Sequence, residues 1–193
     1  EERLKACLKL IRKKTSVFSN FRSAMELVFA CMLSLEEEPE LALEKALSAY
    51  DLLKKEFMSS QYLPLAAFLL KDETDMAGYI ARGREIYLTM RKEHPFLTSA
   101  EDSVFAVMMA FSEKDNQTLV EEMEACYTLL KKEFRTGNSV QTVSHVLAIS
   151  GGTPAEKTGK LIELYETLRQ SGLKYSKYYE LPTLAALSTM PVD

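Results

Sequence analysis

Tryptophan is absent from this chain of 193 residues, and glycine (7) and proline (6) are scarce. Stretches rich in β-branched residues are also few, which argues against a sheet protein, because strands favour β-branched and aromatic side chains. Scarce glycine and proline are typical of long helices joined by short links. The composition therefore favours an all-α protein.

Other absences bear on the compartment. Three cysteines are an odd number and imply no closed set of disulfides. We expect Cys7 and Cys126 to be small buried side chains rather than reactive thiols, because the matching positions of the repeat described below are apolar. No apolar run is long enough for a membrane span, and no signal peptide opens the sequence. We therefore expect a cytoplasmic protein with no membrane partner.

The charge balance disfavours nucleic acid. The chain carries 24 Lys and Arg against 28 Asp and Glu, a net charge of −4. Phosphate backbones are bound by clustered Lys and Arg on one face. The basic pairs Lys54-Lys55 and Lys131-Lys132 are each followed at once by glutamate, as expected for solvated helix ends. We expect no nucleic-acid partner.

An internal repeat is the strongest pattern that the chain does contain. The phrase Tyr50-Asp-Leu-Leu-Lys-Lys-Glu-Phe57 returns as Tyr127-Thr-Leu-Leu-Lys-Lys-Glu-Phe134, and more loosely at 8–15, 87–94 and 165–172. The copies follow one another at intervals of 37 to 42 residues. A period of this size is typical of stacked helical repeats.

Each copy is predicted to form a helix that leads into a second helix. Apolar side chains between 116 and 135 recur every three or four residues, which is the pattern of one helix face. A second helix, richer in apolar residues, follows each of the five copies. These second helices are predicted at 25–33, 63–70, 104–111, 143–149 and 184–187. Because these second helices are apolar nearly all round, we expect them to lie between layers rather than at the surface.

The predicted fold is a single all-α domain over residues 1–193. It has about five helix-hairpin repeats of roughly 37–42 residues, arranged as an α-solenoid or an α/α superhelix. Glu1 already lies in helical register, and the chain stops after Pro191-Val-Asp193. We therefore expect a fragment of a longer protein.

Helix starts can be read at several places. Pro39 stands near the first position of a helix. Thr153-Pro-Ala-Glu156 and Thr98-Ser-Ala-Glu101 both have the pattern of a capping box. The segment 151–160 resembles a phosphate-binding loop only briefly, because its Gly-Lys spacing is wrong and Leu161 stands where Ser or Thr is needed.

The links inside the hairpins do not repeat, and they carry the candidate binding residues. If the hairpins stack in one sense, the links lie along one edge, where the second helices present unpaired N–H groups that can receive a carboxylate, a phosphate or a peptide. The alternative is that the polar link residues only cap helices. The candidates are Asn20, Arg22, Gln61, Tyr62, His94, Thr98, Glu101, Asp102, Asn138, Gln141, His145 and Tyr178.

The two histidines allow a chemical alternative. His94 stands in the register of the terminal phenylalanines, so we expect it at the core edge, with Pro95 ending its helix. His145 lies among valines, as expected for a hydrogen-bonded core histidine. A site that joined both with Glu101 and Asp102 would offer acid–base or metal chemistry, although no spacing demands it.

Three tyrosines in the last link, Tyr175, Tyr178 and Tyr179, allow two interpretations. They either grip a peptide or sugar, or tie the link to the body of the protein.

Four phrases carry a resemblance to a known family. They are 18–22 (Phe-Ser-Asn-Phe-Arg), 94–102 (His-Pro-Phe-Leu-Thr-Ser-Ala-Glu-Asp), 137–147 and 174–181. The chain resembles, over nearly its whole length, an uncharacterised bacterial family, the domain of unknown function numbered four thousand and three. The resemblance implies a bacterial cytoplasmic protein and longer members, but no activity, cofactor or binding residue.

Two functions are consistent with these patterns. The first is a non-enzymatic binding or scaffold protein that engages a peptide or protein partner through repeat loops and helix N-termini. The second is an enzyme or small-ligand sensor with a polar site around His94, Glu101, Asp102 and His145. A structural homodimer is a third possibility. Because no catalytic or cofactor motif is present, we favour the first and expect neither cofactor nor metal.

Overall fold

The computed structural model describes residues 1–95, 97–135, 137–174 and 180–190. Throughout these ranges the regular structure consists of ten α-helices and one short 3-10 helix, with no strand. The predicted all-α class is therefore confirmed. Within the same ranges, no helix combines the length and the apolar character needed to cross a lipid bilayer.

Long and short helices alternate along the chain, as the repeated phrases predict. In order they are α1 (Glu2–Lys14), η1 (Asn20–Arg22), α2 (Glu26–Ser34), α3 (Pro39–Glu56), α4 (Leu63–Leu70), α5 (Met76–Glu93), α6 (Asp102–Ala110), α7 (Asn116–Glu133), α8 (Gly137–Ala148), α9 (Pro154–Gln170) and α10 (Leu181–Ser188). The helix predicted at 116–135 is α7, and each of the second helices is present.

The chain divides into two compact units. Unit 1 comprises Glu1–Tyr87 and Ser99–Phe111, and unit 2 comprises Leu88–Thr98 and Ser112–Asp193. The boundary falls inside α5, which therefore contributes residues to both units.

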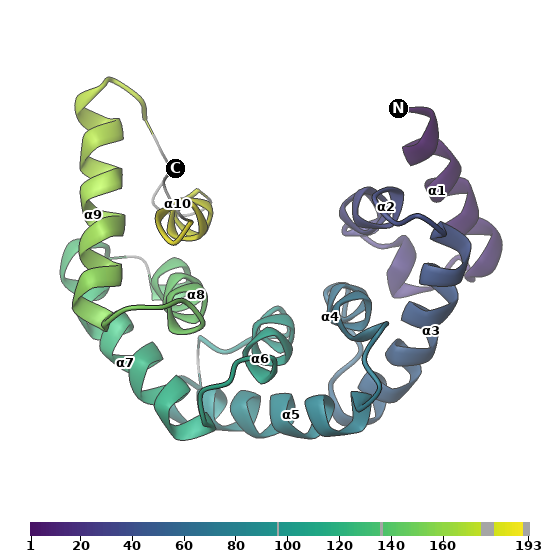
Figure 1. The fold of residues 1–193 in the computed structure, drawn as a ribbon, viewed down its shortest axis with the longest axis horizontal. Helices are drawn as coiled ribbons and strands as arrows, with labels where there is room; N and C mark the ends of the chain where they lie inside the picture. Colours follow the sequence, from purple (N-terminus) through teal and green to yellow (C-terminus); the bar gives the residue numbers. More distant parts are fainter. Residues whose placement is uncertain (96, 136, 175–179, 191–193) are drawn as a thin grey trace. The chain divides into compact units, whose positions relative to one another are not determined.

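Unit 1 is built from helix pairs. Helix α1 packs against α2 and α3 packs against α4, while α4 also contacts α6 (Figure 1). The core between the first pairs is aromatic, since Phe29 contacts Phe21 and Phe68 edge-on with ring centroids 4.9 and 5.6 Å apart. Burying each such side chain stabilises the fold by about 1.5–3 kcal/mol.

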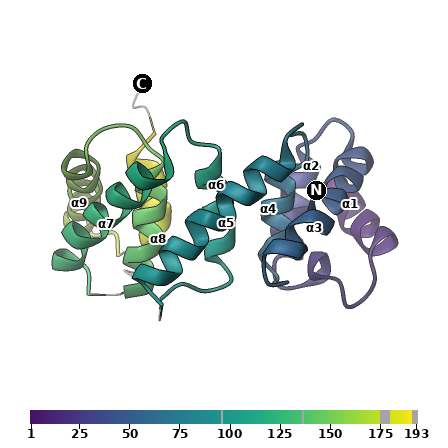
Figure 2. The same cartoon turned by 90° about the horizontal axis from the view of Figure 1, so that it is seen from below.

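Unit 2 is centred on α8. This helix packs against α7, α9 and α10 (Figure 2). Leu130, Phe134, Val143 and Leu161 lie in the core that these helices share. Helix α8 also buries polar side chains, among them Gln141 and His145, so the centre of the unit is not purely apolar.

Local signals set the helix starts as expected in two cases. Pro39 occupies the first turn of α3, where its missing N–H costs no hydrogen bond. At α9 the predicted capping box is confirmed, because the Thr153 hydroxyl accepts from the Glu156 amide and the Glu156 carboxylate accepts from the Thr153 amide at 2.8 Å. Two backbone donors are thereby satisfied.

Rings connect the copies of the repeated phrase from residue 50 onward. At these three junctions the residue that ends one copy contacts the tyrosine that begins the next. The pairs are Phe57 with Tyr87 at 5.7 Å, His94 with Tyr127 at 4.6 Å, and Phe134 with Tyr165 at 5.2 Å between ring centroids. Such pairs contribute about 0.5–1.5 kcal/mol beyond the burial of their area. The expected place of His94 at the core edge is confirmed.

The cysteines follow the prediction. Cys7 and Cys126 are buried, and burial raises the pKa of both thiols, so neither is a thiolate near neutral pH. Cys31, by contrast, is exposed on α2.

Candidate functional site

In unit 1 the first candidate, Asn20, holds two links together. Its amide donates to the Tyr50 hydroxyl at 2.8 Å and to the Ser59 hydroxyl at 2.7 Å. Tyr50 and Ser59 are themselves 2.9 Å apart, which closes a triangle. Asn20 is half-buried there, so its polar atoms fasten the η1 segment to the link after α3.

The neighbouring candidates Arg22, Gln61 and Tyr62 are half-buried in the links that precede α2 and α4. Glu26, in the first turn of α2, is paired with Arg12 at 2.8 Å. Hydrogen bonds from Arg12 lower the pKa of Glu26, and the charge of Arg22 adds to this effect. Arg22 thus supports an ionised carboxylate at a helix N-terminus, where negative charge is favourable.

Asp102 is the most perturbed acid of unit 1. It is buried at the start of α6, and its carboxylate accepts a hydrogen bond from the Ser99 amide. Burial raises the pKa of Asp102 to about 6, because desolvation outweighs that hydrogen bond. Glu101 immediately precedes it as the N-cap residue of α6.

The N-cap residues of α2, α4 and α6 are Met25, Tyr62 and Glu101, and none of these described side chains caps its helix. The link residues Ser23 and Ser60 nevertheless accept from the amides of Met25 and Tyr62, so helix capping by polar link residues stays an open interpretation. The box predicted at Thr98 and Glu101 is wrong. The Thr98 hydroxyl instead donates to the Met90 carbonyl at 3.1 Å, which ties it to the end of α5.

In unit 2, Thr98 and Gln141 are brought together. The Gln141 amide donates to the Thr98 hydroxyl at 3.1 Å, although 43 residues separate them. The Oε1 atom of Gln141 is buried and has no hydrogen-bond partner among the described residues. Gln141 lies inside α8 rather than at its start, so it joins helix and link.

His94 lies beside an acid that the sequence did not single out. Its Nε2 is 2.8 Å from the Glu124 carboxylate, and its ring packs on Tyr127. Together with Lys131 these residues line an open pocket of about 380 Å³. The His94 side chain is only 17% exposed, so the pair stands at the pocket's edge.

His145 is a core residue. It lies on α8 at 1% exposure. Burial, with a smaller contribution from the charge of His94, lowers the pKa of His145 to about 3. The imidazole is therefore neutral at neutral pH. Asn138, also on α8, is exposed, and Tyr178 lies outside the described residues, as do Tyr175 and Tyr179.

The chemical hypothesis gains no support from these surroundings. Glu101 and Asp102 belong to unit 1, whereas His94 and His145 belong to unit 2. Over the described ranges, no three side chains of His, Cys, Asp or Glu come together in a way that could hold a metal ion.

A lysine cluster in unit 2 was missed by the sequence analysis. Lys114 and Lys157 both contact one carboxylate, Glu122, and both donate to the Ser150 carbonyl. Burial raises the pKa of Glu122, but hydrogen bonds from the two lysines outweigh it and lower the pKa overall. Lys157 is 4% exposed. Its position corresponds to Leu119 in the preceding copy, so a lysine at a core position was the available signal.

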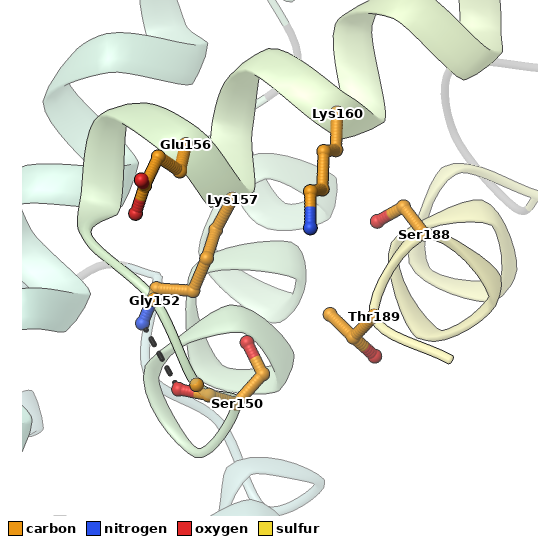
Figure 3. Close-up of a pocket in the computed structure, with 8 residues that line it drawn as sticks. Ser150, Gly152, Glu156, Lys157, Lys160, Ser188 and Thr189 are labelled. Carbon is orange, nitrogen blue, oxygen red and sulfur yellow. Dashed lines mark hydrogen bonds between the residues drawn. The ribbon is translucent and has the colours of Figure 1, made fainter. Parts of the chain in front are cut away.

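A pocket lies above this cluster. It is formed by the α8–α9 link, the first turns of α9 and the end of α10, and has a volume of about 210 Å³ (Figure 3). Lys157, Lys160, Ser188 and Thr189 are among the residues that line it.

Comparison with known proteins places this geometry in a family context. A family model described as "Protein of unknown function (DUF4003)" matches residues 1–191. The chain is 27% identical over 187 residues to the uncharacterized protein YeaA of Bacillus subtilis (strain 168). That alignment covers 92% of this chain and 56% of the relative, so the chain spans little more than half of the relative's length. No solved structure matches the chain.

Proposed function

Since the chain belongs to the family described as a protein of unknown function (DUF4003), we propose a function from its structure. The protein is a non-enzymatic scaffold, and a partner protein docks through an apolar helix face onto the outer side of α2.

The observation that carries this proposal is an exposed apolar stripe on α2. The stripe consists of Leu27, Val28, Cys31 and Leu35, all of which are exposed. Their spacing places them on one helix face, opposite the buried Phe29 and Leu33. Leu27 is 56% exposed and Leu35 is 85% exposed.

The stripe also corrects an expectation. The apolar composition of α2 predicts burial all round, and this is wrong for its outer face, because no described residue covers it. Contiguous apolar patches on soluble proteins mark interaction sites more often than scattered apolar residues do. The link before α2 adds Phe18, which is 98% exposed.

The helix arrangement supports the same proposal. Helix pairs joined by equivalent ring contacts are what a stack of hairpin repeats requires, and we propose that each unit is part of such a stack. Stacked hairpins commonly present rows of helix faces to partner proteins. An amphipathic helix of the partner would match the spacing of the stripe.

Cys31 allows a direct test, because it lies in the stripe whereas Cys7 and Cys126 are buried. A photoreactive maleimide placed on Cys31 should crosslink one partner in an extract of the source cells. Leu27→Glu should abolish the crosslink, and the purified partner should bind the unmodified protein but not this variant.

A matched control is Leu88→Glu, which charges a similarly exposed leucine (47%) on α5. It should leave the crosslink intact. Crosslinks that survive Leu27→Glu, or a crosslink only between two copies of this chain, would overturn the proposal.

A further inference from the structure

We propose that the pocket between the α8–α9 link and the end of α10 binds a small oxyanion of the phosphate class. The pocket lies wholly in unit 2 and shares no residue with the stripe on α2. It includes part of the segment 151–160, which lacks the spacing of a nucleotide-binding loop.

The side chains around the pocket direct positive charge inward. In Figure 3 the ammonium group of Lys160 and the hydroxyl of Ser188 point into the space, whereas the Glu156 carboxylate points away from both. Glu156 is held in that position by Thr153, whose amide and hydroxyl both donate to it at 2.8 Å. The nearby acid is thus engaged in helix capping. Hydrogen bonds from Thr153, with a smaller contribution from the charge of Lys160, lower the pKa of Glu156, so this carboxylate offsets part of the Lys160 charge from outside the space (Figure 3).

The floor of the pocket adds a buried ammonium group. Lys157 lines the pocket, and its Nζ contacts Glu122 and the Ser150 carbonyl at 3.2 Å. The Glu122 carboxylate is shared with Lys114, at 2.9 Å, so it neutralises Lys157 only in part. A buried charge of this kind acts through a low local dielectric and favours an anion above it.

Neutral donors complete the site. The link passes the pocket as Gly151-Gly152, and Gly152 has a φ of 89°, a conformation that favours glycine. Ser188 and Thr189 donate their hydroxyls to carbonyls of their own helix at 2.8 Å. A hydroxyl can rotate toward a charged acceptor, because a charge-assisted hydrogen bond is about twice as strong as a neutral one.

The size of the pocket restricts the ligand. A volume of about 210 Å³ admits one tetrahedral oxyanion with a few waters, but does not enclose a whole nucleotide. The ligand is therefore either inorganic phosphate or the phosphate group of a small monoester whose remainder stays outside. Both present the same oxygens to Lys160 and the hydroxyls.

The test is titration calorimetry of the full chain with sodium phosphate and, separately, with glycerol phosphate, at constant ionic strength. We expect saturable binding to the wild type. Lys160→Ala should weaken it roughly tenfold or more, the effect of losing one charge-assisted hydrogen bond. Lys92→Ala removes an exposed lysine of the same unit and should bind as the wild type does.

The two titrants distinguish the source of the phosphate. Tighter binding of glycerol phosphate indicates a monoester, and equal or weaker binding indicates inorganic phosphate; both outcomes support the site. Absence of saturation, or equal weakening by Lys160→Ala and Lys92→Ala, would overturn it. Neither result bears on docking at α2, because the two surfaces have no residue in common.

Discussion

Replacement of the buried His145 by leucine should change how the stability of unit 2 depends on pH. The pKa of His145 is about 3 in the folded protein and near 6.5 in an unfolded chain. Between these values the unfolded chain binds a proton that the folded protein does not. Acidification through this window therefore destabilises the wild type.

The size of the effect follows from the two pKa values. Between pH 7 and pH 5 the unfolded imidazole becomes almost fully protonated while the folded one stays neutral, which costs the wild type about 2 kcal/mol of unfolding free energy. His145→Leu removes this cost. The unfolding free energy of the variant, relative to that of the wild type, should therefore rise by about 2 kcal/mol between pH 7 and pH 5, whatever the difference between the two proteins at pH 7.

Urea denaturation followed by far-UV circular dichroism at several pH values between 7.5 and 4.5 measures this difference. Comparing the two proteins cancels the contributions of all other titrating groups that they share. A difference in unfolding free energy that stays constant across the range would refute the inference that burial keeps the imidazole neutral.

Two further changes have defined outcomes. Burial raises the pKa of Asp102 to about 6, so acidification from pH 7 to pH 5 adds about 1 kcal/mol to the unfolding free energy of unit 1. Asp102→Asn should lose this gain in stability in the same denaturation series. A variant with the same pH dependence as the wild type would contradict the raised pKa. Phe134→Ala should lower the unfolding free energy by about 3–5 kcal/mol, because the ring is buried against Tyr165. Phe18→Ala, at 98% exposure, should change it by less than about 0.5 kcal/mol, and a loss at Phe134 as small as this would show that the ring contact is not formed.

The helices could be predicted because their signal is local and repeated. The anchors Tyr50, Tyr127 and Tyr165 recur with the same apolar spacing, so each copy confirms the helical assignment of the others. The capping box at Thr153 was equally readable, since all its atoms lie within four residues.

The polar sites could not be predicted, because their partners are distant in sequence. Thr98 has the local pattern of a capping residue, but its hydroxyl is taken by Met90 and by Gln141 from another helix. Lys157 stands in the register of Leu119, which indicates a core position, but its partner Glu122 lies 35 residues earlier and is not indicated by that register. No local pattern encodes such pairings.

The outer face of α2 shows a different limit. Its apolar composition predicted burial correctly for Phe29 and Leu33, but wrongly for Leu27 and Leu35. An apolar composition predicts that a helix face is buried, but it does not identify the residues or the molecule that would bury it.

The ring contacts between copies restrict the insertions and deletions that the repeated phrase can accept. Phe57 meets Tyr87 and Phe134 meets Tyr165 through the same two positions of the repeated phrase. Duplication of one of the copies that begin at Tyr50, Tyr87 or Tyr127 would leave each ending ring opposite a beginning tyrosine, whereas loss of a few residues inside a helix would separate them. Family members should therefore differ in length by whole copies, with insertions confined to the links.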